Sequence, residues 1–192
     1  MSIRVVIAED EAIIRLDLKE TLEEEGYEVV GETGRGDKAV DLVRELQPDL
    51  AILDIKMPGM DGIEAARLIT KDRICGVLVL TAFSQREVIE QARDAGALAY
   101  LVKPFQKTDL VPAIEVAIAR FREMQALNGE VDALEEQLET RKSIYRAKGI
   151  LIDQCSMSDS DAYGFIQRGA MNHRATMKAV ADMVISGELR PE

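Results

Sequence analysis

The sequence contains no tryptophan, one histidine and two cysteines, and these scarcities exclude several classes of site. Cys75 and Cys155 lie far apart and form no CxxC pair, so together with His173 they cannot supply the ligands of a known type of zinc site. Two isolated cysteines fit a reduced, cytosolic chain better than a disulfide-stabilised secreted one. No apolar run approaches the ~20 residues that span a bilayer, and residues 1–6 lack the features of a signal peptide. We therefore expect a cytoplasmic protein without membrane contact.

Basic residues are also in the minority, although not evenly along the chain. The net charge of −11 argues against indiscriminate binding to nucleic acids or anionic membranes. Residues 141–192 nevertheless carry eight basic and six acidic side chains, or +2, which leaves −13 for residues 1–140. An acidic body followed by a mildly basic tail indicates two modules with different partners.

The first 120 residues alternate between strand and helix patterns. Apolar, often β-branched runs predict strands at residues 3–8, 28–31, 50–53, 77–81 and 99–102. Helical spacing predicts helices at residues 12–25, 36–46, 62–70 and 85–95, and another from about residue 107. Such an alternation predicts an α/β domain, a doubly wound five-stranded parallel sheet of order 2-1-3-4-5.

The remaining chain has helical patterns alone. An apolar stripe has heptad-like spacing and strongly charged flanks; it consists of Met124, Leu127, Val131, Leu134, Leu138 and Tyr145. The stripe predicts a coiled-coil helix and a homodimer that forms through residues 121–145. The alternative is an amphipathic helix that packs on its own domain. Further helices are predicted through residues 162–166 and at 174–186. The expected organisation is 1–120 for the α/β domain, 121–140 for the linker helix and 141–192 for a small three-helix all-α domain.

Asp54 ends the most apolar strand, directly before a turn rich in proline and glycine. Glu9 and Asp10 follow the first strand, which neighbours the third strand in the expected order, so the three carboxylates should converge at the sheet edge where ligands bind. Clustered carboxylates repel one another unless a cation neutralises them, and Mg²⁺ prefers oxygen ligands. The alternative is that the acidic residues after the first strand are only a solvated helix cap.

Two other strands of the same sheet end in polar residues, Thr81 and Lys103. A lysine can neutralise a transferred phosphoryl group and a hydroxyl can bond one of its oxygens. Phosphoryl transfer needs little more from a protein than positioning and charge neutralisation. A metal, a lysine and a hydroxyl around Asp54 therefore predict a nucleophilic carboxylate that accepts a phosphoryl group.

These residues and their spacing resemble the receiver domain of bacterial two-component response regulators. The resemblance implies that Asp54 is the phosphoacceptor for a sensor histidine kinase and that Glu9, Asp10, Asp54 and the carbonyl of Lys56 hold Mg²⁺. It also implies that Thr81 and Tyr100 form the switch, that Lys103-Pro104 is a cis peptide, and that the domain is no enzyme beyond slow autodephosphorylation. Glu9 stands where aspartate is commoner.

Two basic groups in the tail contain no acidic residue between their members, and they could follow a phosphate backbone. Their members are Arg141, Lys142, Arg146 and Lys148, and then Arg168, His173, Arg174 and Lys178. Tyr145, Tyr163 and Phe165 could stack on unpaired bases, or belong to a core or seam. The alternative for either basic group is a solvated helix face.

The segment from about residue 135 to 187 resembles the ANTAR domain, an RNA-binding module of antiterminators. The matching segments are AKGIL at 147–151, RGAM at 168–171 and Arg174, whereas Thr176 stands where family members often have a base. The resemblance implies a regulator in which phosphorylation controls binding to stem–loops of nascent transcripts, and hence transcription antitermination. There are two alternatives. One is a DNA-binding regulator, and the other is a phosphorelay or docking protein whose tail only dimerises.

Overall fold

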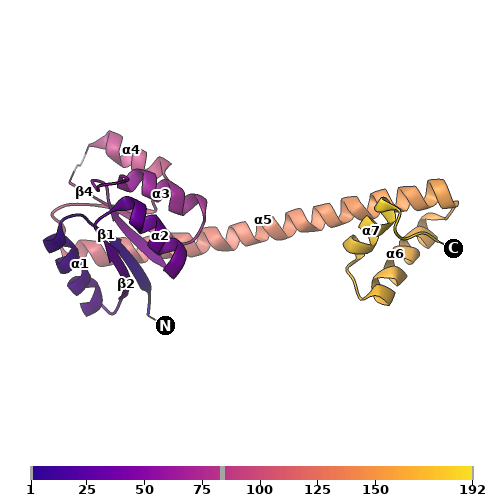
Figure 1. The fold of residues 1–192 in the computed structure, drawn as a ribbon, viewed down its shortest axis with the longest axis horizontal. Helices are drawn as coiled ribbons and strands as arrows, with labels where there is room; N and C mark the ends of the chain where they lie inside the picture. Colours follow the sequence, from indigo (N-terminus) through magenta and orange to yellow (C-terminus); the bar gives the residue numbers. More distant parts are fainter. Residues whose placement is uncertain (1, 83–84, 192) are drawn as a thin grey trace. The chain divides into compact units, whose positions relative to one another are not determined.

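The computed structural model describes residues 2–82 and 85–191, and the chain divides into two compact units, Met1–Gln125 and Ala126–Glu192. The first unit contains one parallel sheet with the strand order β2-β1-β3-β4-β5 (Figure 1). The strands are β1 (Arg4–Ala8), β2 (Glu28–Thr33), β3 (Leu50–Asp54), β4 (Gly76–Thr81) and β5 (Ala99–Val102). The helices between them are α1 (Ala12–Glu24), α2 (Gly36–Leu46), α3 (Gly62–Lys71) and α4 (Arg86–Asp94). The predicted fold class and strand order are confirmed.

Helices cover both faces of this sheet. Alternate residues of β1, β3 and β4 point to opposite faces, so each strand contributes to two apolar clusters. One cluster is closed by α2, α3 and α4, and the other by α1 and the first turns of α5 (Lys107–Cys155). Because β3 and β4 are buried along their whole length, their sequences are continuous apolar runs up to the polar residues that end them.

The second unit packs the last turns of α5 against α6 (Asp159–His173) and α7 (Met177–Ser186). The core of this unit is apolar and drawn from all three helices; its fully buried members include Ala147, Leu151, Ala162, Ile166, Val180 and Ala181. The Ser158 side chain caps α6, because it accepts a hydrogen bond from the backbone N–H of Asp161.

The predicted start of the last helix at residue 174 is wrong. Arg174 has a left-handed backbone with φ of 51° and ends α6. The Thr176 hydroxyl then accepts a hydrogen bond from the backbone N–H of Ala179, so α7 begins at Met177. Thr176, which departs from the usual base, therefore has a structural role as a helix cap.

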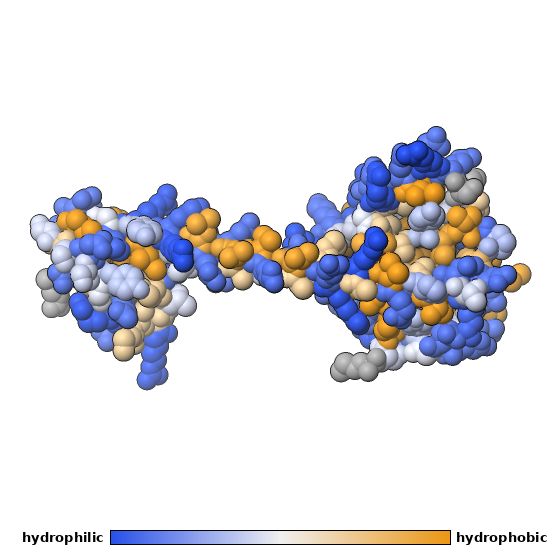
Figure 2. All heavy atoms as spheres, turned by 180° about the vertical axis from the view of Figure 1, so that it is seen from behind, coloured by the Kyte–Doolittle hydropathy of each residue, from blue (hydrophilic) through white to orange (hydrophobic). Residues whose placement is uncertain are grey.

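The predicted seam is exposed along α5. Its members Met124, Leu127, Val131, Leu134 and Leu138 are between 42% and 63% exposed, and Figure 2 shows apolar side chains at the surface along this helix. Within residues 2–82 and 85–191, no helix combines the length and the apolarity required to cross a membrane. The exposed stripe is thus a surface that a single copy of the chain leaves uncovered.

Candidate functional site

Four strands bring polar residues to one edge of the sheet. Asp54 and Thr81 are the last residues of β3 and β4, and Glu9 and Lys103 directly follow β1 and β5. The registers align these ends, since Ala8 lies opposite Leu53 and Thr81 lies opposite Val102. The backbone N–H of Lys103 also donates to the carbonyl of Thr81 at 2.8 Å. The sequence therefore predicts correctly which residues meet.

Three carboxylates converge at this edge. Oxygens of Glu9, Asp10 and Asp54 all lie within 4.8 Å of one another. Glu9 has no exposed surface and Asp54 is 6% exposed, whereas Asp10 faces solvent. The acidic residues after β1 are therefore more than a solvated helix cap, because one of them is buried against the carboxylate of a neighbouring strand.

Lys103 bridges the two buried carboxylates. Its Nζ lies 2.5 Å from Oε2 of Glu9 and 2.9 Å from Oδ1 of Asp54. Burial raises the pKa of Glu9, and the Asp54 charge adds to this, while the bond from Lys103 opposes both. Burial would lower the pKa of Lys103, but its bonds to Glu9 and Asp54 outweigh burial and raise it. The ammonium is therefore held in its charged form beside Asp54.

An open cavity of about 160 Å³ gives access to this group, and residues that line it include Asp10, Asp54, Lys56 and Lys103. Thr81 is 2% exposed at the end of β4. Lys103-Pro104 is a cis peptide, as expected. Tyr100, on β5, is 45% exposed.

The site fits a small, hard cation. Its ligand atoms are oxygens, and one lysine faces three carboxylates, so negative charge remains in excess. Glu9, Asp10 and Asp54 could hold the ion through side-chain oxygens. Lys56, whose backbone carbonyl is predicted to be a fourth ligand, lines the same cavity.

Sequence reasoning missed two residues that position these groups. Arg15 on α1 donates from Nη1 to the backbone carbonyl of Glu9 at 2.6 Å. Gly62 begins α3 where an added Cβ would lie 2.0 Å from the carbonyl oxygen of Asp54, so only glycine fits there. The sequence did carry a signal for Gly62, because two glycines follow Asp54 within eight residues.

The predicted RNA-binding residues on α5 lie in two different environments. Lys142 pairs with Glu139 at 2.8 Å, and the pKa of Glu139 is lowered first by this bond and further by the charges of Lys178 and Arg146. The charge of Lys178 on α7 therefore reaches Glu139 on α5. Lys148 is instead only 13% exposed and pairs with Asp159 at the start of α6 at 2.6 Å.

The other predicted RNA-binding residues are exposed at separate places. Arg141 is exposed one turn before Tyr145, Arg168 is exposed on α6, and Arg174 is exposed at the end of that helix. Phe165 packs against the core, whereas Tyr145 and Tyr163 are 71% and 44% exposed. Phe165 is therefore a core residue, whereas Tyr145 and Tyr163 remain at the surface.

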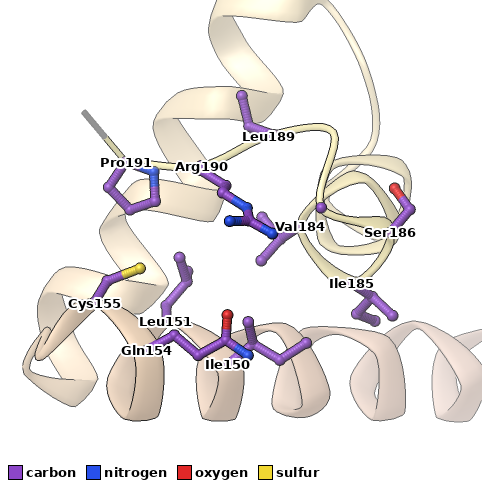
Figure 3. A pocket seen from close by; sticks show the side chains of 11 residues that line it. Ile150, Leu151, Gln154, Cys155, Val184, Ile185, Ser186, Leu189, Arg190 and Pro191 are labelled. Atoms are coloured by element: carbon purple, nitrogen blue, oxygen red, sulfur yellow. The ribbon is translucent and has the colours of Figure 1, made fainter.

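A cavity of about 240 Å³ lies between the end of α5, the end of α7 and the segment that follows α7 (Figure 3). Ile150, Leu151, Val184 and Leu189 make much of its wall apolar, and Arg190 contributes a charge. None of the predicted RNA-binding residues lines this cavity, so it is distinct from the surfaces that they form.

Comparison with known proteins assigns both units. Residues 5–115 match the response regulator receiver domain and residues 132–185 match the ANTAR domain. The transcriptional regulatory protein PdtaR of Mycobacterium tuberculosis is 59% identical over 182 residues, which are 95% of this chain and 89% of that protein. The chain is a response regulator.

Two further comparisons concern the receiver domain alone. The chemotaxis protein CheY of Thermotoga maritima is 41% identical over 59% of this chain and 96% of its own length. The solved receiver domain of the response regulator NarL from Mycobacterium tuberculosis has a TM-score of 0.59 and 31% identity, covering 62% of this chain and 97% of that one.

The domain pair gives this response regulator its function, the phosphorylation-dependent control of RNA binding in transcription antitermination. The ANTAR match favours this interpretation over a DNA-binding helix-turn-helix output and over a tail that only dimerises. The three-helix unit around Ala147 and Ile166 is the part of the structure that carries the match.

Proposed function

We propose that Asp54 accepts the phosphoryl group from the phosphohistidine of a sensor histidine kinase. A carboxylate oxygen of Asp54 forms the new bond to phosphorus as the bond from phosphorus to the histidine nitrogen breaks. The observation that carries this assignment is the contact of Lys103 with Asp54 at 2.9 Å, at the mouth of an open cavity. Of the carboxylates at this site, Asp54 is the one that combines a lysine partner with a place on the cavity wall.

Lys103 and Thr81 act on the transferred group. Lys103 neutralises charge on the phosphoryl oxygens, for which it must give up part of its contact with Glu9 or Asp54. The Thr81 hydroxyl, at the end of the neighbouring strand, donates a hydrogen bond to a phosphoryl oxygen. Both residues are placed by the sheet, so little reorganisation is needed before transfer.

The metal ligands are Glu9, Asp10, Asp54 and the backbone carbonyl of Lys56. Mg²⁺, when bound, supplies positive charge beside the phosphoryl oxygens and so offsets the excess of carboxylates. Glu9 is shared with Lys103, because the same side chain bonds the ammonium at 2.5 Å. The protein is not a turnover enzyme, and a slow hydrolysis of its own aspartyl phosphate returns it to the resting state.

The switch runs through the end of the sheet. Thr81 moves toward the phosphoryl group, Tyr100 on the adjacent strand repacks, and the surface formed by α4, β5 and α5 changes. Tyr100 has room for this rearrangement because its side chain is 45% exposed in the present state.

The output is RNA binding by a homodimer. The exposed stripe on α5 pairs with that of a second copy through residues 121–145, and each copy presents one ANTAR unit to one stem–loop, which raises avidity. The RNA backbone contacts Arg141, Lys142, Arg146, Lys148, Arg168, Arg174 and Lys178. Within this set, Lys142, Arg146 and Lys178 are the main phosphate contacts, since these three bases share the single carboxylate of Glu139, whereas Lys148 is largely buried beside Asp159.

The test is phosphorylation of the full chain by acetyl phosphate in Mg²⁺, followed by intact mass. One phosphoryl group should be added to the wild type and none to Asp54→Asn. The matched control is Asp41→Asn, a solvent-facing aspartate on α2 that should leave labelling unchanged. Continued labelling of Asp54→Asn at one group per chain would show that another residue is the acceptor.

A further inference from the structure

Two tyrosines of the second unit remain exposed although aromatic side chains are rare in this chain. Tyrosine and phenylalanine together make up 4% of the residues, and tryptophan is absent. Tyr145 on α5 is 71% exposed and Tyr163 on α6 is 44% exposed. Leaving such rings in water forgoes the favourable burial of a large apolar surface, so a contact outside the single chain is a reasonable cause.

An ion pair between α5 and α6 links the helix positions of the two tyrosines. The ring of Tyr145 lies 5.6 Å from Nζ of Lys148, and that nitrogen lies 2.6 Å from Oδ1 of Asp159. Tyr163 follows Asp159 by one turn of α6, so it shares the face of that helix that carries the ion pair. The Tyr145 ring thus lies beside the Lys148–Asp159 pair, and Tyr163 lies one helical turn beyond it on α6.

The charge of this face differs from that of the main phosphate contacts. Asp159 neutralises Lys148, so the centre of the face offers little attraction to a phosphate. Lys142 instead pairs with Glu139, and the charges of Arg146 and Lys178 also lower the pKa of that carboxylate, so basic charge is in excess there. A nearly neutral aromatic face suits the flat surface of a nucleobase, while the basic residues suit the backbone.

We infer that Tyr145 and Tyr163 form a stacking platform for unpaired bases in the loops of the bound RNA, which removes Tyr145 from the dimer seam in which its spacing placed it. Single-stranded RNA is commonly recognised by stacking on aromatic side chains, whereas bases inside a duplex are not accessible to them. Arg141, one turn before Tyr145, stands where it can pair with a phosphate that flanks the stacked base. This inference rests on the proposed function, because it presupposes that the ANTAR unit binds RNA.

The probe is an RNA selected by the phosphorylated full chain from stem–loops with randomised loops. The selected RNA is compared with a second form that has the same stems and abasic loops. Stacking of one base changes affinity on the order of tenfold or more, so the wild type should prefer the intact loops by at least that factor. Tyr145→Leu and Tyr163→Leu should bind the intact loops nearly as weakly as the abasic ones, whereas Tyr145→Phe and Tyr163→Phe should keep the preference.

The control is Met171→Leu, a change at a side chain on α6 that is 75% exposed and should not alter the preference. Two results would overturn the platform while leaving RNA binding intact. One is that the leucine variants prefer intact over abasic loops as strongly as the wild type does. The other is that the wild type binds intact and abasic loops equally well. Loss of dimer mass in Tyr145→Leu by light scattering, with the preference for intact loops retained, would assign Tyr145 to the seam and also overturn it. Failure to select any RNA would instead refute the proposed function.

Discussion

Lys103 is the only lysine in contact with the buried carboxylates among the residues described, and its removal should be costly. In Lys103→Met the ammonium is lost, while the volume of the aliphatic stem is roughly kept. Glu9, which has no exposed surface, and Asp54, which is 6% exposed, then face each other without a counter-charge. The remaining partner of a broken buried ion pair is left desolvated and unpaired, so the folded state is destabilised.

Removing one member of such a pair typically costs 3–5 kcal/mol. Lys103 is 13% exposed on its side chain and Asp54 faces an open cavity, so water can reach part of the site. We therefore expect a decrease of about 3 kcal/mol in the free energy of unfolding without metal, at the low end of that range. Added Mg²⁺ should stabilise Lys103→Met more than the wild type, because the variant has lost the ammonium that pairs with Glu9 and Asp54.

The assay uses Cys75 as a reporter of the receiver domain. Cys75 is 1% exposed, and burial raises the pKa of its thiol to about 12, so it should react only when this unit unfolds. Cys155 is exposed in the second unit and is replaced by serine in every variant. Labelling of Cys75 across a urea series then gives the free energy of unfolding of the receiver domain alone.

Lys107→Met is the matched control, because Lys107 forms its ion pair with Glu25 at the surface, where solvent screens it. Its effect on the urea midpoint should be far smaller than that of Lys103→Met. Equal shifts for the two variants would refute the reasoning, since they would show that the pocket does not depend on its lysine.

Three other changes test separate parts of the structure. Tyr27→Phe removes the hydrogen bond to Glu115 and should cost about 1 kcal/mol by urea unfolding at pH 8. Because burial and Glu115 raise the pKa of Tyr27 from 10.0 to about 12, this contribution is complete below pH 10 and should be lost as the pH rises through about 12; an unchanged difference at high pH would contradict the assignment. Thr176→Ala removes the cap of α7 and should lower the stability of the second unit by about 1 kcal/mol, whereas Thr176→Ser should restore it in thermal unfolding followed by circular dichroism. Gly62→Ala forces a methyl group against the carbonyl of Asp54 and should slow phosphorylation by acetyl phosphate on the order of a hundredfold. A wild-type rate would show that the end of β3 can shift without displacing Asp54 from its reactive position.

The receiver site could be predicted because its residues are tied to regular structure. Asp54, Thr81 and Lys103 are placed by strand ends, and parallel strands bring their ends to one edge. The bounds of α2 and β5 are as predicted, since proline or glycine punctuates the chain beside them. Arg15 could not be predicted, because its contact with the carbonyl of Glu9 depends on the side-chain path across a turn of α1.

The second unit was harder to predict for two physical reasons. Helical spacing places Lys148 on the same face as Arg141, but spacing does not show that Asp159 of the next helix neutralises it. A left-handed residue is rare outside glycine and asparagine, so the end of α6 at Arg174 has no clear sequence signal. Pairing between helices and backbone conformation at their ends are properties of the tertiary structure.

The central claim is that one phosphoryl group on Asp54 controls RNA binding by the second unit. The most direct measurement is the affinity of the full chain for a selected two-stem–loop RNA, with and without acetyl phosphate, in the wild type and in Asp54→Asn. The account predicts that phosphorylation strengthens binding by the wild type and leaves Asp54→Asn at the resting affinity. Equal affinity of the phosphorylated and resting wild type, or a response of Asp54→Asn to acetyl phosphate, would contradict it.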